Sequence, residues 1–272
     1  RFTLQPLEIN QTETFLTQWF EDIDPAWGEA LVKRLSMEKE LRQMAGNPLF
    51  LSIMASIWQG YEEDGIVPDR GEVYRRITDF LLETWTEHKN IRSAFSADQK
   101  RLILRKLALA THSRHRRSMT EKEIIDVITR HSLGAGLGIN EFGLLLRELW
   151  QRNELLVQVS PSVFEFAQLS FQEFFTAQEL SDGTGNIDTL LSHIAEPNWR
   201  EIFFFYAGLA RDPSPLIRHI LEDTTDDIFY NRLISAGRCL AEADSANPKL
   251  REKIIQKLWD IYLLGEYPLL RD

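Results

Sequence analysis

The sequence has a single cysteine, Cys239, among its 272 residues. One thiol cannot form an internal disulfide, and it excludes a zinc site built from several cysteines. Cysteine usage this low is typical of a reducing compartment, so we expect a cytoplasmic protein. The longest strongly apolar run, residues 202–210, is far shorter than the roughly 20 residues that a membrane helix needs. We therefore expect neither a disulfide framework nor a membrane partner.

Several motifs of nucleotide and hydrolytic chemistry are also missing. No G-x-x-x-x-G-K-[ST] occurs, so these residues contain no phosphate-binding loop, and neither H-E-x-x-H nor G-x-S-x-G is present. His112 and His115 are close enough to share a helical face, but the arginines around them disfavour a bound cation. The glycines of residues 134–138 have the spacing of a connecting turn and not of a dinucleotide-binding loop. We predict no catalytic residue and no metal site here.

The charge balance is acidic, with 31 basic against 41 acidic residues and a net charge of −10. Such a balance argues against a protein whose main task is to coat nucleic acid. Residues 100–117 invert it locally, with seven Lys and Arg residues and no acid. Two interpretations are open. The run either faces nucleic acid or phosphate, or it is a helix face that is solvated or contacts an acidic neighbour.

Capping signals predict a series of consecutive helices, and hence a mainly α fold. Capping boxes begin at Asn10, Asp69, Ser96, Thr120 and Ser170, each before an apolar run of helical period. Prolines occupy first-turn positions, where their missing N–H costs nothing. The predicted helices comprise residues 11–20, 25–35, 37–45, 48–59, 71–88, 97–113, 121–131, 141–152, 171–180, 187–195, 197–211, 215–222, 227–243 and 248–264.

Two segments break the helical period. Residues 2–9 alternate loosely and predict a single strand, whose edge groups need partners from a sheet outside this sequence. Residues 155–159 and 163–167 predict a β-hairpin around a turn that contains Pro161. Three helices followed by this hairpin have the order of a winged-helix domain. A helical bundle precedes them, and HEAT-like pairs of short helices follow from about residue 186.

The charges of this predicted domain bear on the choice of partner. In a winged helix that reads DNA, the third helix and the wing carry basic contacts. Here the wing, residues 157–166, has no Lys or Arg, and the third helix balances Arg147 and Arg152 with Glu141 and Glu148. We expect this surface to pack against protein. A DNA-binding regulator that uses residues 100–117 is the alternative function, and a plain helical-repeat scaffold is a third.

Three segments together carry a family resemblance. They are MAGNPLFLSIMA at residues 44–55, VPDRGEVYRRI at 67–77 followed by LLETW at 81–85, and FAQLSFQEFF at 166–175. In this order and spacing they resemble the C-terminal part of a NACHT module, the nucleotide switch of STAND-type P-loop ATPases. The resemblance covers about residues 1–180. Residues 198–241 look like the helical array that often follows in such proteins.

The resemblance implies a division of the chain. Residues 1–9 would be the last strand of a nucleotide-binding core that is mostly absent here, 10–95 a helical domain, 96–182 a winged-helix domain and 183–272 the start of a helical superhelix. The core would hold ADP or ATP with Mg²⁺. This segment would be a lid without catalytic groups that couples the ADP/ATP state to opening and homo-oligomerisation. Prokaryotic signalling or antiviral defence is the expected setting.

The resemblance also implies binding residues. Pro48 matches the family proline that packs on the adenine base, and a helix beginning at Asn47-Pro48 offers a rigid ring and nearby amides. An ordinary first-turn proline is the other interpretation, and both can hold. Gln168 stands where many members place a histidine that reaches the ADP β-phosphate. A neutral amide gives weaker bonds than a charged donor, so the contact is weaker or another residue supplies it. Alternatively, Gln168 is a plain strand-end residue.

Two apolar groups are expected to be core. Leu169, Phe171, Phe174 and Phe175 would fix the hairpin to the helix that follows it. Residues 203–206 (FFFY) cover too much of a helix circumference for one buried stripe. We therefore expect them to be buried between stacked helices.

Overall fold

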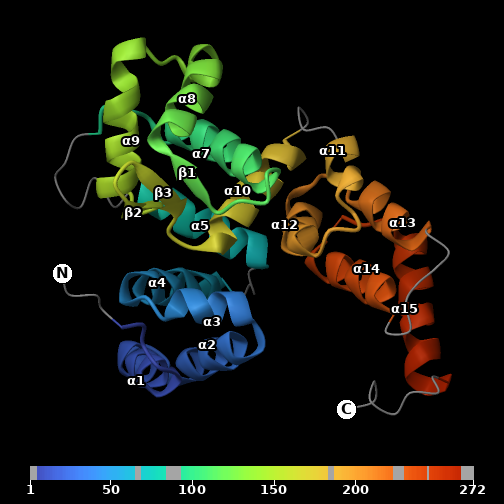
Figure 1. Ribbon diagram of the computed structural model, residues 1–272. Coiled ribbons are helices and arrows are strands. Elements are labelled where there is room, and N and C mark those ends of the chain that lie inside the picture. Colours follow the sequence, from blue (N-terminus) through green and yellow to red (C-terminus); the bar gives the residue numbers. More distant parts are fainter. Residues whose placement is uncertain are drawn as a thin grey trace.

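The computed structural model describes residues 5–64, 69–83, 93–182, 187–222, 230–243 and 245–264. Over these residues the chain is mainly α-helical, with one three-stranded antiparallel sheet (Figure 1). The predicted mainly α class is confirmed. Of the described helices, none combines the length and hydrophobicity that crossing a bilayer requires.

The elements fall into three stretches of sequence. The first contains α1 (Ile9–Phe20), α2 (Pro25–Met37), α3 (Lys39–Ala45), α4 (Pro48–Asp64) and α5 (Arg70–Leu82). The second contains α7 (Ala97–His112), β1 (Ser118–Thr120), α8 (Glu121–Ala135), the short 3₁₀ helix η1 (Ile139–Glu141), α9 (Phe142–Gln151), β2 (Leu156–Ser160), β3 (Val163–Phe166) and α10 (Leu169–Ser181). The third contains α11 (Ile187–Ser192), η2 (Pro197–Trp199), α12 (Arg200–Leu209), α13 (Ser214–Glu222), α14 (Asn231–Glu242) and α15 (Pro248–Leu264).

Three of the predicted capping residues do cap helices. The Asp69 carboxylate accepts a hydrogen bond from the Glu72 amide at 2.8 Å. Ser96 forms a complete capping box at the start of α7. Thr120 does the same for α8, because its hydroxyl accepts from the Glu123 amide while Glu123 accepts from the Thr120 amide. These local signals were sufficient because each pairs residues only three positions apart.

The other two predicted boxes are each displaced by two residues from the N-cap in the structure. Helix α1 begins at Ile9, and its capping box joins Glu8 to Gln11 in place of Asn10 to Glu13. Helix α10 begins at Leu169, with Gln168 as an N-cap residue whose side chain makes no capping bond. Ser170 already lies inside α10, because only residues 167 and 168 separate the end of β3 from the start of this helix.

The strand expected at residues 2–9 is absent from residues 5–9, which are the part of it that the structure describes. Residues 1–4 lie outside the described part, residues 5–8 have no regular secondary structure, and Ile9 begins α1. The Leu7 amide donates to the Gly46 carbonyl at 2.7 Å. This segment therefore uses its backbone to contact the end of α3 and not to extend a ladder.

The predicted hairpin is confirmed, but it belongs to a sheet with one more strand. Strand β3 lies between β1 and β2, and both pairings are antiparallel. Strand β1 was missed because its three residues are too short to show an alternating pattern. The Glu121 amide donates to the Ser162 carbonyl at 2.8 Å, which connects the hairpin turn to the start of α8.

The glycine-rich segment is a connecting turn, as predicted. Gly136 follows α8 with a φ of 63°, a left-handed conformation that suits glycine. The Leu137 amide donates to the Ser132 carbonyl at 2.9 Å across this turn. The segment therefore ends a helix in the usual glycine-dependent way.

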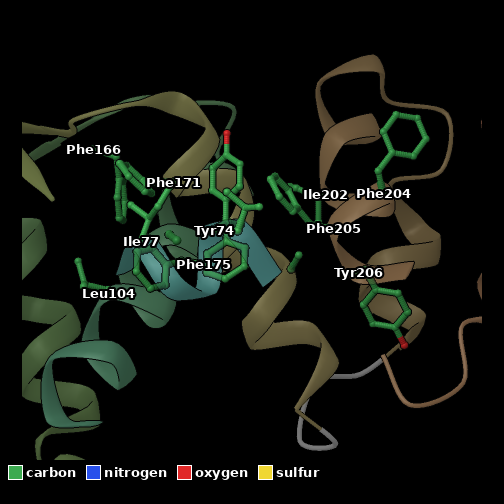
Figure 2. Close-up of a cluster of buried hydrophobic side chains, with 14 of the residues drawn as sticks. Tyr74, Ile77, Leu104, Phe166, Phe171, Phe175, Ile202, Phe204, Phe205 and Tyr206 are labelled. Atoms are coloured by element: carbon green, nitrogen blue, oxygen red, sulfur yellow. The ribbon is translucent and has the colours of Figure 1, made fainter. Parts of the chain in front are cut away.

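An aromatic core joins helices from all three stretches. Tyr74 of α5 is fully buried, and its ring centroid lies 4.8 Å from Phe205 of α12 and 5.7 Å from Phe174 of α10. Figure 2 shows Tyr74 between these helices, with Phe204 and Tyr206 pointing away on other sides of α12. All four residues of 203–206 are buried, which confirms their predicted burial.

Helix packing makes α10 the central element of the fold. It packs against α7 on one side and α12 on the other, and it also contacts α5. Helices α1–α4 contact one another, while α14 packs against α12, α13 and α15. The buried Asn153 amide donates to the Leu81 carbonyl at 2.8 Å, which ties α9 to the end of α5.

An ion pair between α7 and α9 lies inside the core. Lys100 Nζ of α7 is 3.0 Å from Glu148 Oε2 of α9, and both side chains are almost fully buried. Burial by itself raises the pKa of Glu148, but bonds from the Ala94 amide, the Ser93 hydroxyl and Lys100 bring this pKa below its ordinary value. Glu148 also accepts from Arg152 at 2.9 Å. Among the described residues, Glu148 is the one acid within ion-pair distance of Lys100.

This asymmetry predicts the effect of breaking the pair from either side. Lys100→Met leaves Glu148 with Arg152 and two neutral donors, so we expect a loss of about 3 kcal/mol. Glu148→Leu leaves an unpaired buried ammonium, so its loss in unfolding free energy should be larger. Urea unfolding measures both. The exposed Arg116→Gln is the control, with a loss below about 1 kcal/mol. Equal, small losses for all three variants would contradict this account.

Candidate functional site

Pro48 and Asn47 lie at the start of α4. Pro48 is the first helical residue, and its ring is exposed, as contact with a flat base requires. The Asn47 carboxamide oxygen accepts from the Leu49 amide at 2.9 Å, so this side chain caps the helix. Gly46 brings the N-terminal segment close, because a Cβ at this position would lie 3.2 Å from Pro6. The segment at residues 6–7 therefore lies against Gly46, two positions before Pro48.

Gln168 lies in a polar cavity of about 500 Å³. Its backbone is extended, and its half-buried side chain makes no bond to the helix that it precedes. The cavity has walls from separate parts of the fold: Lys39 and Gln43 from α3, residues 165–170, 172 and 173 around the end of β3 and the start of α10, and Glu201 of α12. Pro48 and Asn47 do not line it. The structure thus places one of the three predicted site residues in a cavity, while the other two lie just beyond the end of α3.

The basic run of residues 100–117 is neutralised by acids of the same chain. Arg105 and Lys106 both contact Glu179 of α10, at 3.2 and 2.5 Å. Arg101 lies 2.8 Å from Asp79 of α5. Of the two interpretations of residues 100–117, the helix face that contacts acidic neighbours therefore agrees with the structure. These neighbours come from α5, α9 and α10. Sequence reasoning did not find them because they are distant along the chain.

The end of the basic run shows the same pairing at the surface. Arg116 and Arg114 lie 2.7 and 3.5 Å from Glu123. The Thr120 amide, followed by Arg116 and the Thr120 hydroxyl, lowers the pKa of Glu123 to about 2. Arg117 is the exception, because no acid of the described residues lies within ion-pair distance of it, and it lines the cavity of Gln168.

Gln172 holds the segment that carries Arg117. Its Nε2 atom donates to the Arg116 carbonyl at 2.9 Å and lies 3.3 Å from His112 Nδ1. Gln172 itself is buried and lines the cavity. The backbone before Arg117 is therefore fixed from the first turn of α10.

Glu201 enters the cavity from α12, but its charge is already matched. Arg70 Nη1 lies 2.8 Å from Glu201 Oε2, and the Arg70 guanidinium stacks 4.1 Å from the Phe205 ring centroid. Arg70 is 4% exposed. This pair connects α5 to α12, and no local pattern could predict it, because 131 positions separate its partners.

His112 and His115, for which no metal site is predicted, contact Asn198, and the nearby His193 contacts Trp199. His112 Nε2 lies 3.1 Å from the Asn198 carbonyl oxygen, while His115 Nδ1 lies 3.0 Å from the Asn198 side-chain nitrogen. His193 stacks on Trp199 with a centroid distance of 3.8 Å. Across the described ranges, no group of three or more His, Cys, Asp and Glu residues has the arrangement of a metal site.

Comparison with known proteins adds no identification. No family model and no curated protein matches the sequence.

The contacts of His112 predict a pH-dependent stability. The Asn198 carbonyl only accepts and the Gln172 Nε2 only donates, so His112 is neutral with its proton on Nε2. Burial lowers the pKa of His112, and His115 and His193 lower it further, against the Asn198 carbonyl and Glu196. Because the folded pKa is below the unfolded value of about 6.5, the unfolded state binds more protons, and stability falls as the pH drops below that value.

The test compares wild type with His112→Asn. Urea unfolding at pH 7.5 and 5.5 should show a steeper loss for wild type, by up to about 1.4 kcal/mol per pH unit. His131, whose pKa burial also lowers, is present in both proteins and cancels in the comparison. An unchanged pH dependence in the variant would show that His112 titrates normally in the folded protein.

Proposed function

We propose that this chain is the lid and regulatory segment of a NACHT-type signalling ATPase. The observation that carries the proposal is the polar cavity at Gln168, whose walls come from α3, from β3 and α10, and from α12. A ligand phosphate in this cavity would contact the three stretches of sequence at once. Such a position suits a module whose parts must close on a nucleotide and separate when the nucleotide changes.

The arrangement of the middle stretch supports a winged-helix domain at residues 96–182. Its element order is helix α7, strand β1, helices α8 and α9, and the hairpin β2–β3, with β3 between the other two strands. The pairwise packing of α12–α15 supports a HEAT-like superhelix at 183–272. A helical domain at 10–95 agrees with the mutual packing of α1–α4, to which α5 adds contacts with the other two units.

The residues present fit a lid for a purine nucleotide. The exposed Pro48 ring would pack on the adenine face, and Gln168 would donate its free amide to the phosphates of ADP. Asn47 would contribute by holding the start of α4 in place through its cap. The nucleotide-binding core of the parent chain would hold Mg²⁺ and supply the catalytic groups, so this segment by itself should not hydrolyse ATP.

Opening of this lid would expose surface for homo-oligomerisation, in a cytoplasmic signalling or prokaryotic antiviral defence system. DNA binding is the weaker candidate, because acids of the chain neutralise six of the seven cations at residues 100–117. We expect no salt-dependent retardation of duplex DNA.

The adenine contact is tested with two matched prolines in the full-length protein. Pro48 and Pro25 both begin helices and both are exposed. Pro48→Ala removes two methylenes from the base contact at about 0.8 kcal/mol each, so ADP affinity should fall about tenfold. Pro25→Ala should leave it unchanged. Isothermal titration with ADP measures both, and equal affinities in the two variants would refute the contact.

A gain-of-function variant tests Gln168. Gln168→His restores a side chain that becomes cationic, and charge-assisted hydrogen bonds are roughly twice as strong as neutral ones. ADP release from full-length protein should therefore slow, with the larger effect at pH 6, where more of the imidazole is protonated. Stopped-flow release of a fluorescent ADP analogue gives the rate. A rate equal to that of wild type at both pH values would place Gln168 away from the phosphates.

A further inference from the structure

We propose that Arg117 and Lys39 form a binding site for the phosphate chain of the ligand, and that they supply the positive charge that Gln168 lacks. The assignment to a nucleotide depends on the proposed function. The anion site itself depends only on residues of this chain.

Arg117 differs from its basic neighbours in its surroundings. Arg114 and Arg116 direct their guanidinium groups at Glu123, outside the cavity. Arg117 lines the cavity, and no acid of the described residues lies within 4.0 Å of its nitrogens. The Gln172 bond to the Arg116 carbonyl fixes the backbone next to it. A cation held at the edge of a cavity without a protein counter-charge is suited to a charged ligand.

Lys39 approaches the same cavity from the N-terminal helices. It is the first residue of α3, it is exposed, and no ion pair joins it to the described acids. The adjacent Glu38 carboxylate is already used, because Arg34 Nε donates to it at 2.8 Å. Lys39 therefore keeps its charge available on the side of the cavity that α3 forms.

The lining of the cavity holds three acids beside Lys39 and Arg117, and two of these acids already have partners in the protein. Glu201 is paired with Arg70, and Glu173 is buried with a partner in the protein. Glu165 of β3 is the remaining acid of the lining. Lys39, Arg117 and the Gln168 side-chain amide thus line the cavity together with one acid, Glu165, that forms no ion pair with the described residues. A ligand with several negative charges in a row, such as a diphosphate, matches this arrangement better than a single carboxylate does.

The two cations come from different units, so a bound diphosphate would hold α3 to the segment between α7 and β1. Ligand binding to the folded state raises the unfolding temperature. We therefore expect pyrophosphate to stabilise the 272-residue chain without any nucleotide base.

The experiment titrates sodium pyrophosphate into the purified 272-residue chain, with binding measured by calorimetry and stability by thermal unfolding. Arg117→Gln and Lys39→Gln should each weaken binding about tenfold, the size expected for one charged hydrogen bond. Arg116→Gln and Lys33→Gln are the controls, because they remove neighbouring exposed charges that do not line the cavity. Both controls should bind as wild type does.

Three outcomes would overturn the inference: no pyrophosphate binding by wild type, equal weakening by Arg116→Gln and Arg117→Gln, or an identical thermal shift with sodium chloride of the same ionic strength. These outcomes are separate from those for the lid. Dependence of ADP affinity on Pro48 without pyrophosphate binding would refute the anion site alone. Pyrophosphate binding that needs Arg117, together with ADP affinity independent of Pro48, would support the anion site and refute the adenine contact.

Discussion

The packing of Tyr74 against Phe174 and Phe205 is the interaction on which the rest of the structure depends. It brings α5, α10 and α12 together at ring distances of 4.8 to 5.7 Å, although these helices are far apart in the sequence. Buried aromatic side chains provide large apolar areas and prefer tilted or edge-to-face contacts, so they fix angles as well as distances. The start of α10, and with it Gln168, is positioned by this core.

Charge is distributed around the core in a consistent way. Basic side chains of α7 contact acids of α5, α9 and α10, and Arg70, which stacks on Phe205, contacts Glu201. Buried charges are tolerated only when they are paired, which explains why these contacts accompany the helix packing. The cations left without such partners at the cavity, Arg117 and Lys39, therefore stand out, and the proposal for a phosphate site follows from this contrast.

Sequence reasoning succeeded where the signal was local. The helices, the hairpin and the caps at Asp69, Ser96 and Thr120 each depend on residues within a few positions of one another. It failed for β1, because three residues show no period, and for the start of α10, which the short connection from β3 determines. Of the candidate site residues, Gln168 lies in a cavity, while Pro48 and Asn47 lie outside it. That these three residues bind one nucleotide together stays a prediction.

The sequence by itself determined that the chain is mainly helical, where most helices begin, and that residues 203–206 are buried. These properties follow from periodicity and from capping chemistry, which act over one or two turns. Only the tertiary structure decided which charges meet. The partners of Arg105, Lys100 and Arg70 lie 48 to 131 positions away, and no spacing rule reaches so far. The cavity at Gln168 exists for the same reason, because its walls come from elements that only packing brings together.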